Sequence, residues 1–169
     1  MAPEPAAHTQ LRLPVLVTGP VDIGRLLREV EALEHAFLQF ELRKTGEAVK
    51  LPKTSILLDQ TVELNKLNLL QTEHRQALLQ FLKTVKAEAP LLHISFSADP
   101  SPAFTEKLMA WLRKEVHPLV LVTIGLQPTI GAGCVVRSTN KHFDFSLKQN
   151  FTKHRDLLMS KLAAEEVKA

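Results

Sequence analysis

Hydrophobic residues in the first half of the chain recur three and four positions apart, which is the period of an amphipathic helix. The clearest run predicts a helix over residues 22–44 with this apolar stripe: Ile23, Leu26, Leu27, Val30, Leu33, Phe37 and Phe40. Asp22 is expected to be the N-cap, because its carboxylate can accept hydrogen bonds from the free amides of the first turn. Gly46 is expected to follow the helix, since glycine tolerates the left-handed conformation of a C′ residue.

Three further segments belong to this helical region or precede it. Residues 11–17 alternate apolar and other positions, which predicts an extended segment, and Pro14 would restrict that segment to the edge of a sheet. Residues 57–70 are apolar on all sides, which predicts a helix buried between neighbours. Residues 72–89 predict a third helix with Thr72 as its N-cap.

From residue 91 the pattern changes to strands that alternate with helices. Residues 91–97 predict a strand, and residues 119–124 are continuously apolar, as expected for a strand covered on both faces. Between them, Ser101 can cap a helix whose first residue is a proline and whose apolar stripe is Phe104, Leu108, Trp111 and Leu112. Two strands joined by a helix within one sheet usually form a right-handed crossover, so we expect these strands to be parallel.

Residues 127–151 predict a β-hairpin that leads into a last helix. The first strand, residues 130–137, contains Gly131 and Gly133, which are expected to allow a bulge or the close approach of another backbone. The polar turn runs from Ser138 to Lys141, and Asn140 can tolerate a positive φ there.

The returning strand of this hairpin carries Phe143 and Phe145 on one side. Ser146 and Gln149 then have the spacing of a capping box, which predicts that a helix begins here. We expect this helix to face inward with Leu147, Phe151, Leu158 and Leu162 and outward with Lys148, Lys153, Arg155 and Lys161.

The order of these elements predicts an α+β protein, in which a helical amino-terminal region of about three helices precedes a small β-α-β-β-β-α domain. We expect a flexible tail and an extended segment over residues 1–19 and the helical region over residues 20–89. The small α/β domain is expected over residues 90–164 and a short tail over residues 165–169.

Residues that could carry chemistry are few. Cys134 is the single cysteine and lies on the apolar side of its strand, where an inert buried thiol is the common case. A nucleophile pair of Cys134 and His142 across the hairpin is the enzymatic alternative. The seven histidines have no zinc-type spacing, and the sequence "IGAGCVV" lacks the glycine pattern of a phosphate-binding loop. We therefore expect no catalytic residue, no metal site and no cofactor.

Composition limits the location and the partners. The chain is 45% hydrophobic and 23% charged, which is ordinary for a globular domain, and no window approaches the ~18 unbroken apolar residues of a membrane span. Its first ten residues lack the features of a secretory signal, so a cytoplasmic location is expected. The net charge of +3 is too small by itself to predict a polyanionic partner.

Basic residues near the hairpin leave a second functional class open, a small nucleic-acid-binding α/β module. Its basic face would contain Arg137, Lys141, Lys148 and Arg155. The chain has no tyrosine, and its phenylalanines fall mostly on apolar stripes, so no exposed row of aromatic side chains for base stacking is expected.

Residues 91–162 resemble the carboxy-terminal domain of the delta subunit of F-type ATP synthases, which is called the oligomycin-sensitivity-conferring protein in mitochondria. In that family a strand, an apolar-striped helix and a second strand precede a proline-containing bend, a glycine-containing strand, a polar turn and a closing helix. The matching positions in this chain are Ile130, Gly131, Gly133, Arg137, Asn140, Lys141, Asp144, Ser146 and Leu147. Phe145 stands where the family usually has glycine.

This resemblance implies a non-catalytic stator subunit that joins the catalytic head of the synthase to its peripheral stalk. The implied partners are the b-type helices of the stalk and the alpha and beta subunits of the head, at the inner face of the plasma membrane without insertion into it. We expect docking of a stalk helix in an apolar groove, with Leu108, Trp111, Phe143, Phe145, Phe151 and Leu158 as candidate contacts. Trp111 is the favoured anchor, because tryptophan often contributes strongly to binding.

Overall fold

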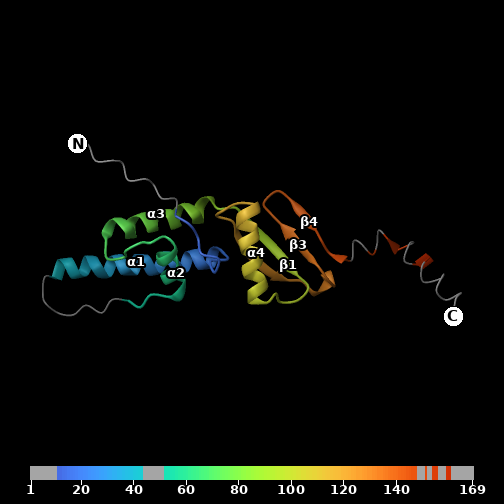
Figure 1. The fold of residues 1–169 in the computed structure, drawn as a ribbon, viewed down its shortest axis with the longest axis horizontal. Helices are drawn as coiled ribbons and strands as arrows, with labels where there is room; N and C mark the ends of the chain where they lie inside the picture. The colour runs from blue at the N-terminus through green and yellow to red at the C-terminus, as the bar shows by residue number, and fades with distance from the viewer. Residues whose placement is uncertain (1–10, 44–51, 148–150, 152–153, 156–158, 161–169) are drawn as a thin grey trace. The chain divides into compact units, whose positions relative to one another are not determined.

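The computed structural model describes residues 11–43, 52–147, 151, 154–155 and 159–160 (Figure 1). Its helices are α1 (Pro20–Arg43), α2 (Ile56–Leu64), α3 (Thr72–Glu88), α4 (Pro102–Glu115) and the 3₁₀ helix η1 (Pro128–Ile130). Its strands are β1 (Leu91–Phe96), β2 (Leu121–Leu126), β3 (Cys134–Arg137) and β4 (His142–Asp144). The predicted α+β class is confirmed, with the helices first and the small sheet after them.

The chain forms two compact units. The helical unit consists of residues Met1–Pro90 and Met109–Leu121, and the sheet unit consists of Leu91–Leu108 and Val122–Ala169. The division passes through α4, so the second half of that helix belongs with α1, α2 and α3. The closing helix expected after Ser146 falls largely outside the described residues.

The core of the helical unit is built from the apolar stripe of α1. Helices α1 and α3 pack along each other, and their buried residues include Ile23, Leu26, Val30, Leu78 and Leu82. This packing confirms the three- and four-residue period as the inward face of α1 from Ile23 to Leu33, whereas Phe40, the last residue of the expected stripe, is 56% exposed.

Helix α1 begins two residues earlier than its sequence pattern indicated. Pro20 occupies the first turn, where its fixed φ fits and its missing N–H costs no intrahelical bond. Asp22 is therefore not the N-cap; instead its Oδ2 accepts hydrogen bonds from Thr18 N at 2.9 Å, Thr18 Oγ1 at 3.0 Å and Gly19 N at 3.1 Å. A carboxylate in this position also compensates the positive end of the helix dipole. Gly46, the expected C′ residue, lies outside the described residues.

Two expectations for the next helices are wrong. The apolar run 57–70 is not one helix, because α2 ends at Leu64 and a turn with a positive φ of 51° at Lys66 follows. Thr72 is not a cap either: Gln71 takes the N-cap position of α3, and the Thr72 hydroxyl accepts a hydrogen bond from Arg75 Nη2 at 3.1 Å.

Residues 11–17 do not form the expected edge strand. Val17 N donates to Pro14 O at 3.0 Å, which closes a turn, and the two side chains between them, Val15 and Leu16, are exposed. Arg113 of α4 donates to the carbonyls of Leu13 at 3.0 Å and Pro14 at 2.6 Å and also to that of Val17. Side-chain donors thus satisfy the carbonyls that a neighbouring strand would satisfy in a sheet.

The sheet has the order β2-β1-β3-β4. The hydrogen bonds Leu121 N to Pro90 O and Gln127 N to Phe96 O advance in the same direction along both strands, so β2 runs parallel to β1 as expected. Strand β3 is antiparallel to β1 and β4 is antiparallel to β3. The expected strand at 130–137 is shorter, because Pro128 starts a 3₁₀ turn that buries Ile130 before β3 begins.

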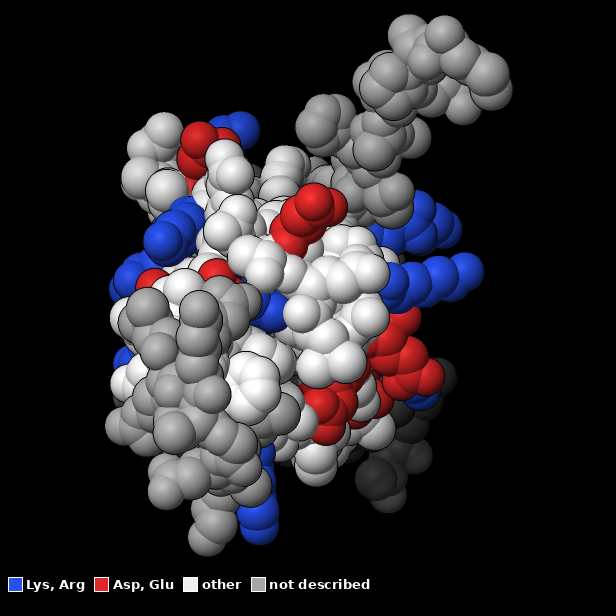
Figure 2. Space-filling view, turned by 90° about the vertical axis from the view of Figure 1, so that its left-hand side faces the viewer, with Lys and Arg blue, Asp and Glu red and all other residues white. Residues whose placement is uncertain are grey.

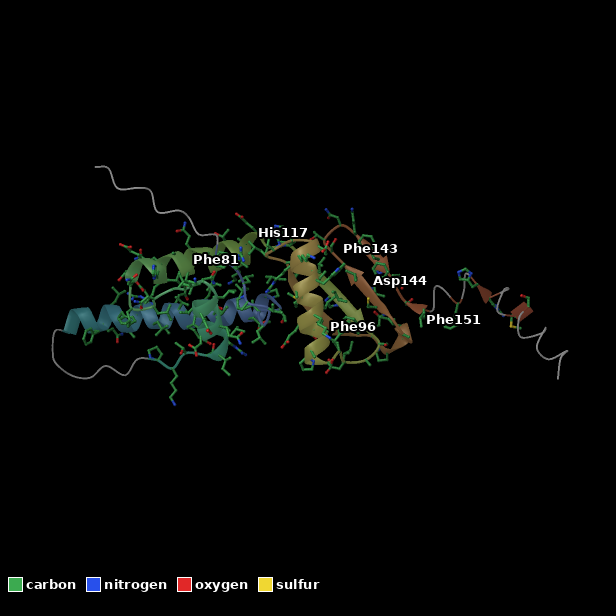
Figure 3. All side chains as sticks on the ribbon, in the orientation of Figure 1. Phe81, Phe96, His117, Phe143, Asp144 and Phe151 are labelled. Carbon is green, nitrogen blue, oxygen red and sulfur yellow. The ribbon has the colours of Figure 1, made fainter. Side chains whose placement is uncertain are left out.

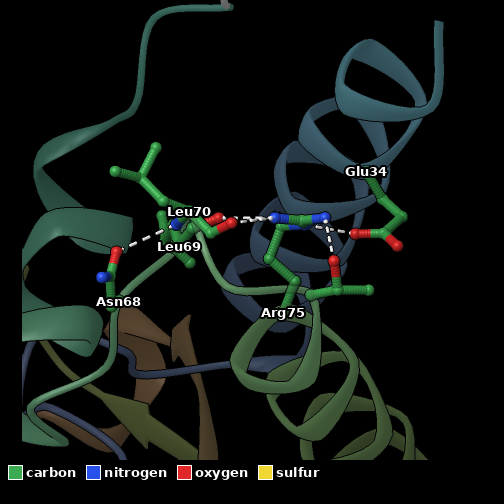
Figure 4. A network of polar contacts seen from close by, with 6 residues as sticks. Glu34, Asn68, Leu69, Leu70 and Arg75 are labelled. Carbon is green, nitrogen blue, oxygen red and sulfur yellow. Dashed lines mark hydrogen bonds and ion pairs between the residues drawn. The ribbon is translucent and has the colours of Figure 1, made fainter. Parts of the chain in front are cut away.

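A buried arginine joins the helices of the helical unit (Figure 4). The Arg75 side chain is 3% exposed, and its Nε is paired with Glu34 of α1. Its Nη1 donates to the carbonyls of Leu69 at 2.9 Å and Leu70 at 3.0 Å, and its guanidinium lies 4.3 Å from the ring centroid of Phe37. One side chain thus connects α1, the α2–α3 turn and α3.

We predict that Arg75→Leu lowers the free energy of unfolding by about 3 kcal/mol, because it leaves the Glu34 carboxylate and the carbonyls of Leu69 and Leu70 without the buried donor they share. Lys114→Leu is the control, since the Lys114–Glu115 pair is exposed and is expected to contribute within about 0.5 kcal/mol. Urea denaturation of both variants measures the difference. Equal effects would show that the Arg75 network does not stabilise the unit.

Candidate partner interface

The β3–β4 hairpin depends on two glycines with left-handed backbone. Gly131 has φ 74° and follows η1, with nothing within 4 Å of the position a Cβ would occupy. Gly133 has φ 95°, and a Cβ there would lie 2.3 Å from the carbonyl oxygen of Phe145. The expected close approach of a second backbone is therefore confirmed at Gly133, whereas Gly131 serves the turn.

Backbone pairing continues past the end of β4. Phe145 N donates to Cys134 O and Leu147 N donates to Ala132 O, both at 2.9 Å. Asp144 Oδ1 accepts a hydrogen bond from Ser146 N at 2.8 Å, and Ser146 is buried. The chain from Asp144 to Leu147 is thus fixed against the strand that contains Gly133.

The turn of the hairpin is closed by Ser138 N, which donates to Lys141 O at 2.8 Å. Asn140 does not use the positive φ that its side chain would tolerate, since Lys66 is the one non-glycine residue with positive φ among those the structure describes. Arg137 and His142 are paired across the strands next to the turn. Arg137, Lys141 and His142 are all exposed, so the turn carries a small basic group.

Phe143 of the edge strand β4, labelled in Figure 3, forms an exposed pair with Phe145, which directly follows that strand. Their rings are stacked, with centroids 6.2 Å apart and an interplanar angle of 15°. Phe143 is 46% exposed and Phe145 is 61% exposed. Two adjacent aromatic rings in contact with solvent form an apolar surface that a partner can cover.

This aromatic pair continues the apolar face of the sheet. Ile94 of β1 is paired with Val136 of β3, and Val136 is paired with Phe143, so the three side chains share one face. Ile94 is 2% exposed and Val136 is half-buried. The face is therefore covered at its centre and becomes uncovered towards β4.

The other candidate contacts differ in exposure. Trp111 and Phe151 are each 57% exposed, and Leu108 is half-buried. Helix α4 buries Met109 and Leu112 instead of its whole expected stripe, and Phe104 is half-exposed with its edge against Phe96 at 5.8 Å. Leu158, Gln149 and Lys148 lie outside the described residues, and Arg155 is exposed.

The structure does not bring Cys134 and His142 together as the enzymatic alternative required. His142 is paired with Arg137, three residues from Cys134 along β3, so the two side chains lie on opposite faces of the sheet. Burial raises the pKa of the Cys134 thiol, which reduces the thiolate fraction at neutral pH. Among the residues that the structure describes, no group of three or more His, Cys, Asp or Glu side chains could hold a metal ion.

Positive and negative side chains are mixed on the face of the molecule that Figure 2 shows. Blue and red side chains are dispersed around a central area of uncharged residues there. None of the described helices has the length and apolar character needed to cross a membrane.

Comparison with known proteins adds no relative. No family model matches the chain, and no curated protein matches it. The resemblance to the delta subunit therefore depends on the residues quoted for it and stays a hypothesis.

We predict that Gly133→Ala destabilises the protein by at least about 2 kcal/mol, because a Cβ would meet the Phe145 carbonyl and a positive φ is unfavourable for alanine. Gly24→Ala in α1 is the matched control, since that Cβ meets nothing within 4 Å. Helix propensity makes the control neutral or stabilising by up to about 1 kcal/mol. Chemical denaturation measures both, and an unaffected Gly133→Ala variant would contradict the close approach.

Proposed function

We propose that this chain is a non-catalytic adaptor in the peripheral stalk of a rotary F-type ATP synthase, where its hairpin binds a b-type stalk helix. The exposed, stacked pair of Phe143 and Phe145 is the observation that carries the proposal. Both residues lie within the part of the chain that resembles the family. An adaptor of this kind needs stiff apolar surfaces and no reactive groups.

The aromatic pair is large enough to contribute substantially to docking. An aromatic side chain buries about 150–250 Å², so covering the exposed half of one ring removes roughly 100 Å² from water. At about 25 cal/mol per Å² this corresponds to roughly 2.5 kcal/mol per ring before the cost of association. A partner helix would add contacts at Leu147 and Phe151, which are also exposed.

A second surface for the catalytic head is proposed on the helical unit. Several large apolar side chains of this unit are exposed, namely Val21, Leu38, Phe40, Ile56 and Leu70. Scattered exposed apolar residues are common on protein surfaces, so this part of the proposal follows from the contact with the head that the resemblance of residues 91–162 implies for the whole subunit.

The experiment for the proposed function is purification of the tagged full chain under native conditions, followed by identification of the co-purifying chains. The proposal predicts recovery of stalk b-type subunits together with alpha and beta subunits of the head. Recovery of an unrelated assembly without these subunits would contradict it.

We predict that Phe143→Ala combined with Phe145→Ala weakens binding of the stalk subunit by at least about a hundredfold, since two roughly 2.5 kcal/mol contributions are lost. Leu126→Ala is the control, because Leu126 is 60% exposed on β2, the opposite edge of the same sheet. Titration calorimetry with the purified stalk subunit measures both affinities. A double variant that binds as tightly as the control would exclude the aromatic pair from the interface.

Nucleic-acid binding is the second candidate, and the exposed aromatic pair favours it more than the sequence pattern did. Base stacking on Phe143 or Phe145 beside Arg137 and Lys141 has the chemistry of a single-strand binding surface. Salt distinguishes the candidates. Phosphate-driven binding weakens steeply between about 50 and 200 mM salt, whereas apolar helix docking changes little.

A further inference from the structure

The helical unit contains a pocket that the adaptor function does not use. Its volume is about 580 Å³, within the range of small-molecule sites. Residues from the amino-terminal segment, α3, α4 and the turn after α4 line it, and Figure 3 labels two of them, Phe81 and His117. Its walls are the apolar side chains Leu11, Leu13, Phe81, Pro118 and Leu119.

The polar groups of this pocket are cationic or donors. Arg12, Arg113 and His117 line it, and among the residues that the structure describes no acidic, amide or hydroxyl side chain does. Leu119 N donates to His117 Nδ1 at 3.1 Å, so the neutral imidazole carries its proton on Nε2, which is a donor. A ligand that fits this lining accepts hydrogen bonds and carries negative charge.

Arg113 has an unused donor. Its two terminal nitrogens donate to backbone carbonyls of the amino-terminal segment, whereas its buried Nε has no hydrogen-bond partner. Burial lowers the pKa of Arg113 to about 10, because removal from water disfavours the charged guanidinium. Because protein atoms enclose this Nε, Arg113 attracts an anion in the pocket through its positive charge and not through a hydrogen bond.

The amino-terminal wall of the pocket is held in place before any ligand binds. Arg12 N donates to Asn65 Oδ1 at 2.7 Å, and Asn65 Nδ2 donates to Arg12 O at 2.9 Å. On the Arg12 side these two hydrogen bonds involve only backbone atoms, so they do not occupy its exposed guanidinium. The wall between Arg12 and Val17 is thus fixed from two sides, by Asn65 and by Arg113.

From these observations we infer that the pocket between Phe81, Arg113 and Leu119 binds an aliphatic carboxylate. Its anionic head accepts hydrogen bonds from Arg12 and from His117 Nε2 and is attracted by the charge of Arg113, while its hydrocarbon chain contacts Leu11, Leu13 and Phe81. The hydrocarbon body follows from the apolar walls and from the described lining residues, which include no acidic, amide or hydroxyl side chain to accept from the donors of a peptide or sugar.

The test is titration of the full chain with octanoate, followed by the backbone amide signals of residues 11–13 and 119 in a heteronuclear NMR spectrum. We expect saturable shifts with octanoate, and at least tenfold weaker binding for 1-octanol, which lacks the charge, and for acetate, which lacks the chain. No saturable shift with octanoate, or equal binding of 1-octanol, would overturn the inference.

Two variants test which side chains bind the carboxylate of octanoate. Arg12→Gln and, separately, His117→Phe are each expected to weaken octanoate binding about tenfold, because each removes one donor to the carboxylate. Arg25→Gln is the matched control, since Arg25 is an exposed arginine of the same unit that lines a different cavity. This control variant should bind octanoate with an affinity within twofold of the wild type. If both donor variants bind octanoate as the control does, the carboxylate does not lie in this pocket and the inference fails.

Discussion

The approach of the Phe145 backbone to Gly133 determines the surface on which the proposed function depends. Only a residue without a side chain leaves room for the Phe145 carbonyl at this position, and the left-handed φ of Gly133 directs the strand to it. The pairing of Phe145 with Cys134 and of Leu147 with Ala132 then fixes the returning chain. With the backbone fixed in this register, Phe143 and Phe145 extend the apolar face of the sheet into solvent.

Periodic patterns predicted the elements with large apolar faces. The stripe of α1, the strand β1, the cap at Ser101 and the parallel pairing of β1 and β2 all follow from residue spacing, and the structure contains them. Ser101 Oγ, for example, accepts a hydrogen bond from Phe104 N at 3.3 Å. These features depend on local backbone geometry and on which positions are buried, and both are indicated by the spacing of residues within a short stretch of sequence.

Contacts between residues that are distant in sequence determine the local structures that the hydrophobic pattern predicted wrongly. Residues 11–17 alternate like a strand, yet Arg113, about a hundred positions away, donates to their carbonyls and stabilises a turn. The run from Leu57 to Leu70 is apolar enough for a long helix, but the Leu69 and Leu70 carbonyls accept from Arg75 outside any helix. The aromatic pair was predicted as contact residues, but its stacking and exposure depend on a strand edge that only the fold defines. The pocket beside Arg113 has no sequence signal, because its lining comes from four separate segments.

The central claim is that the aromatic pair of Phe143 and Phe145 contacts a helix of another subunit. The most direct measurement replaces Phe145 with the photoreactive residue benzoylphenylalanine in the native organism and identifies the cross-linked chain by mass spectrometry. The account predicts a cross-link to a helix of a b-type stalk subunit. A cross-link to nucleic acid, or efficient photolysis with no protein cross-link, would contradict it.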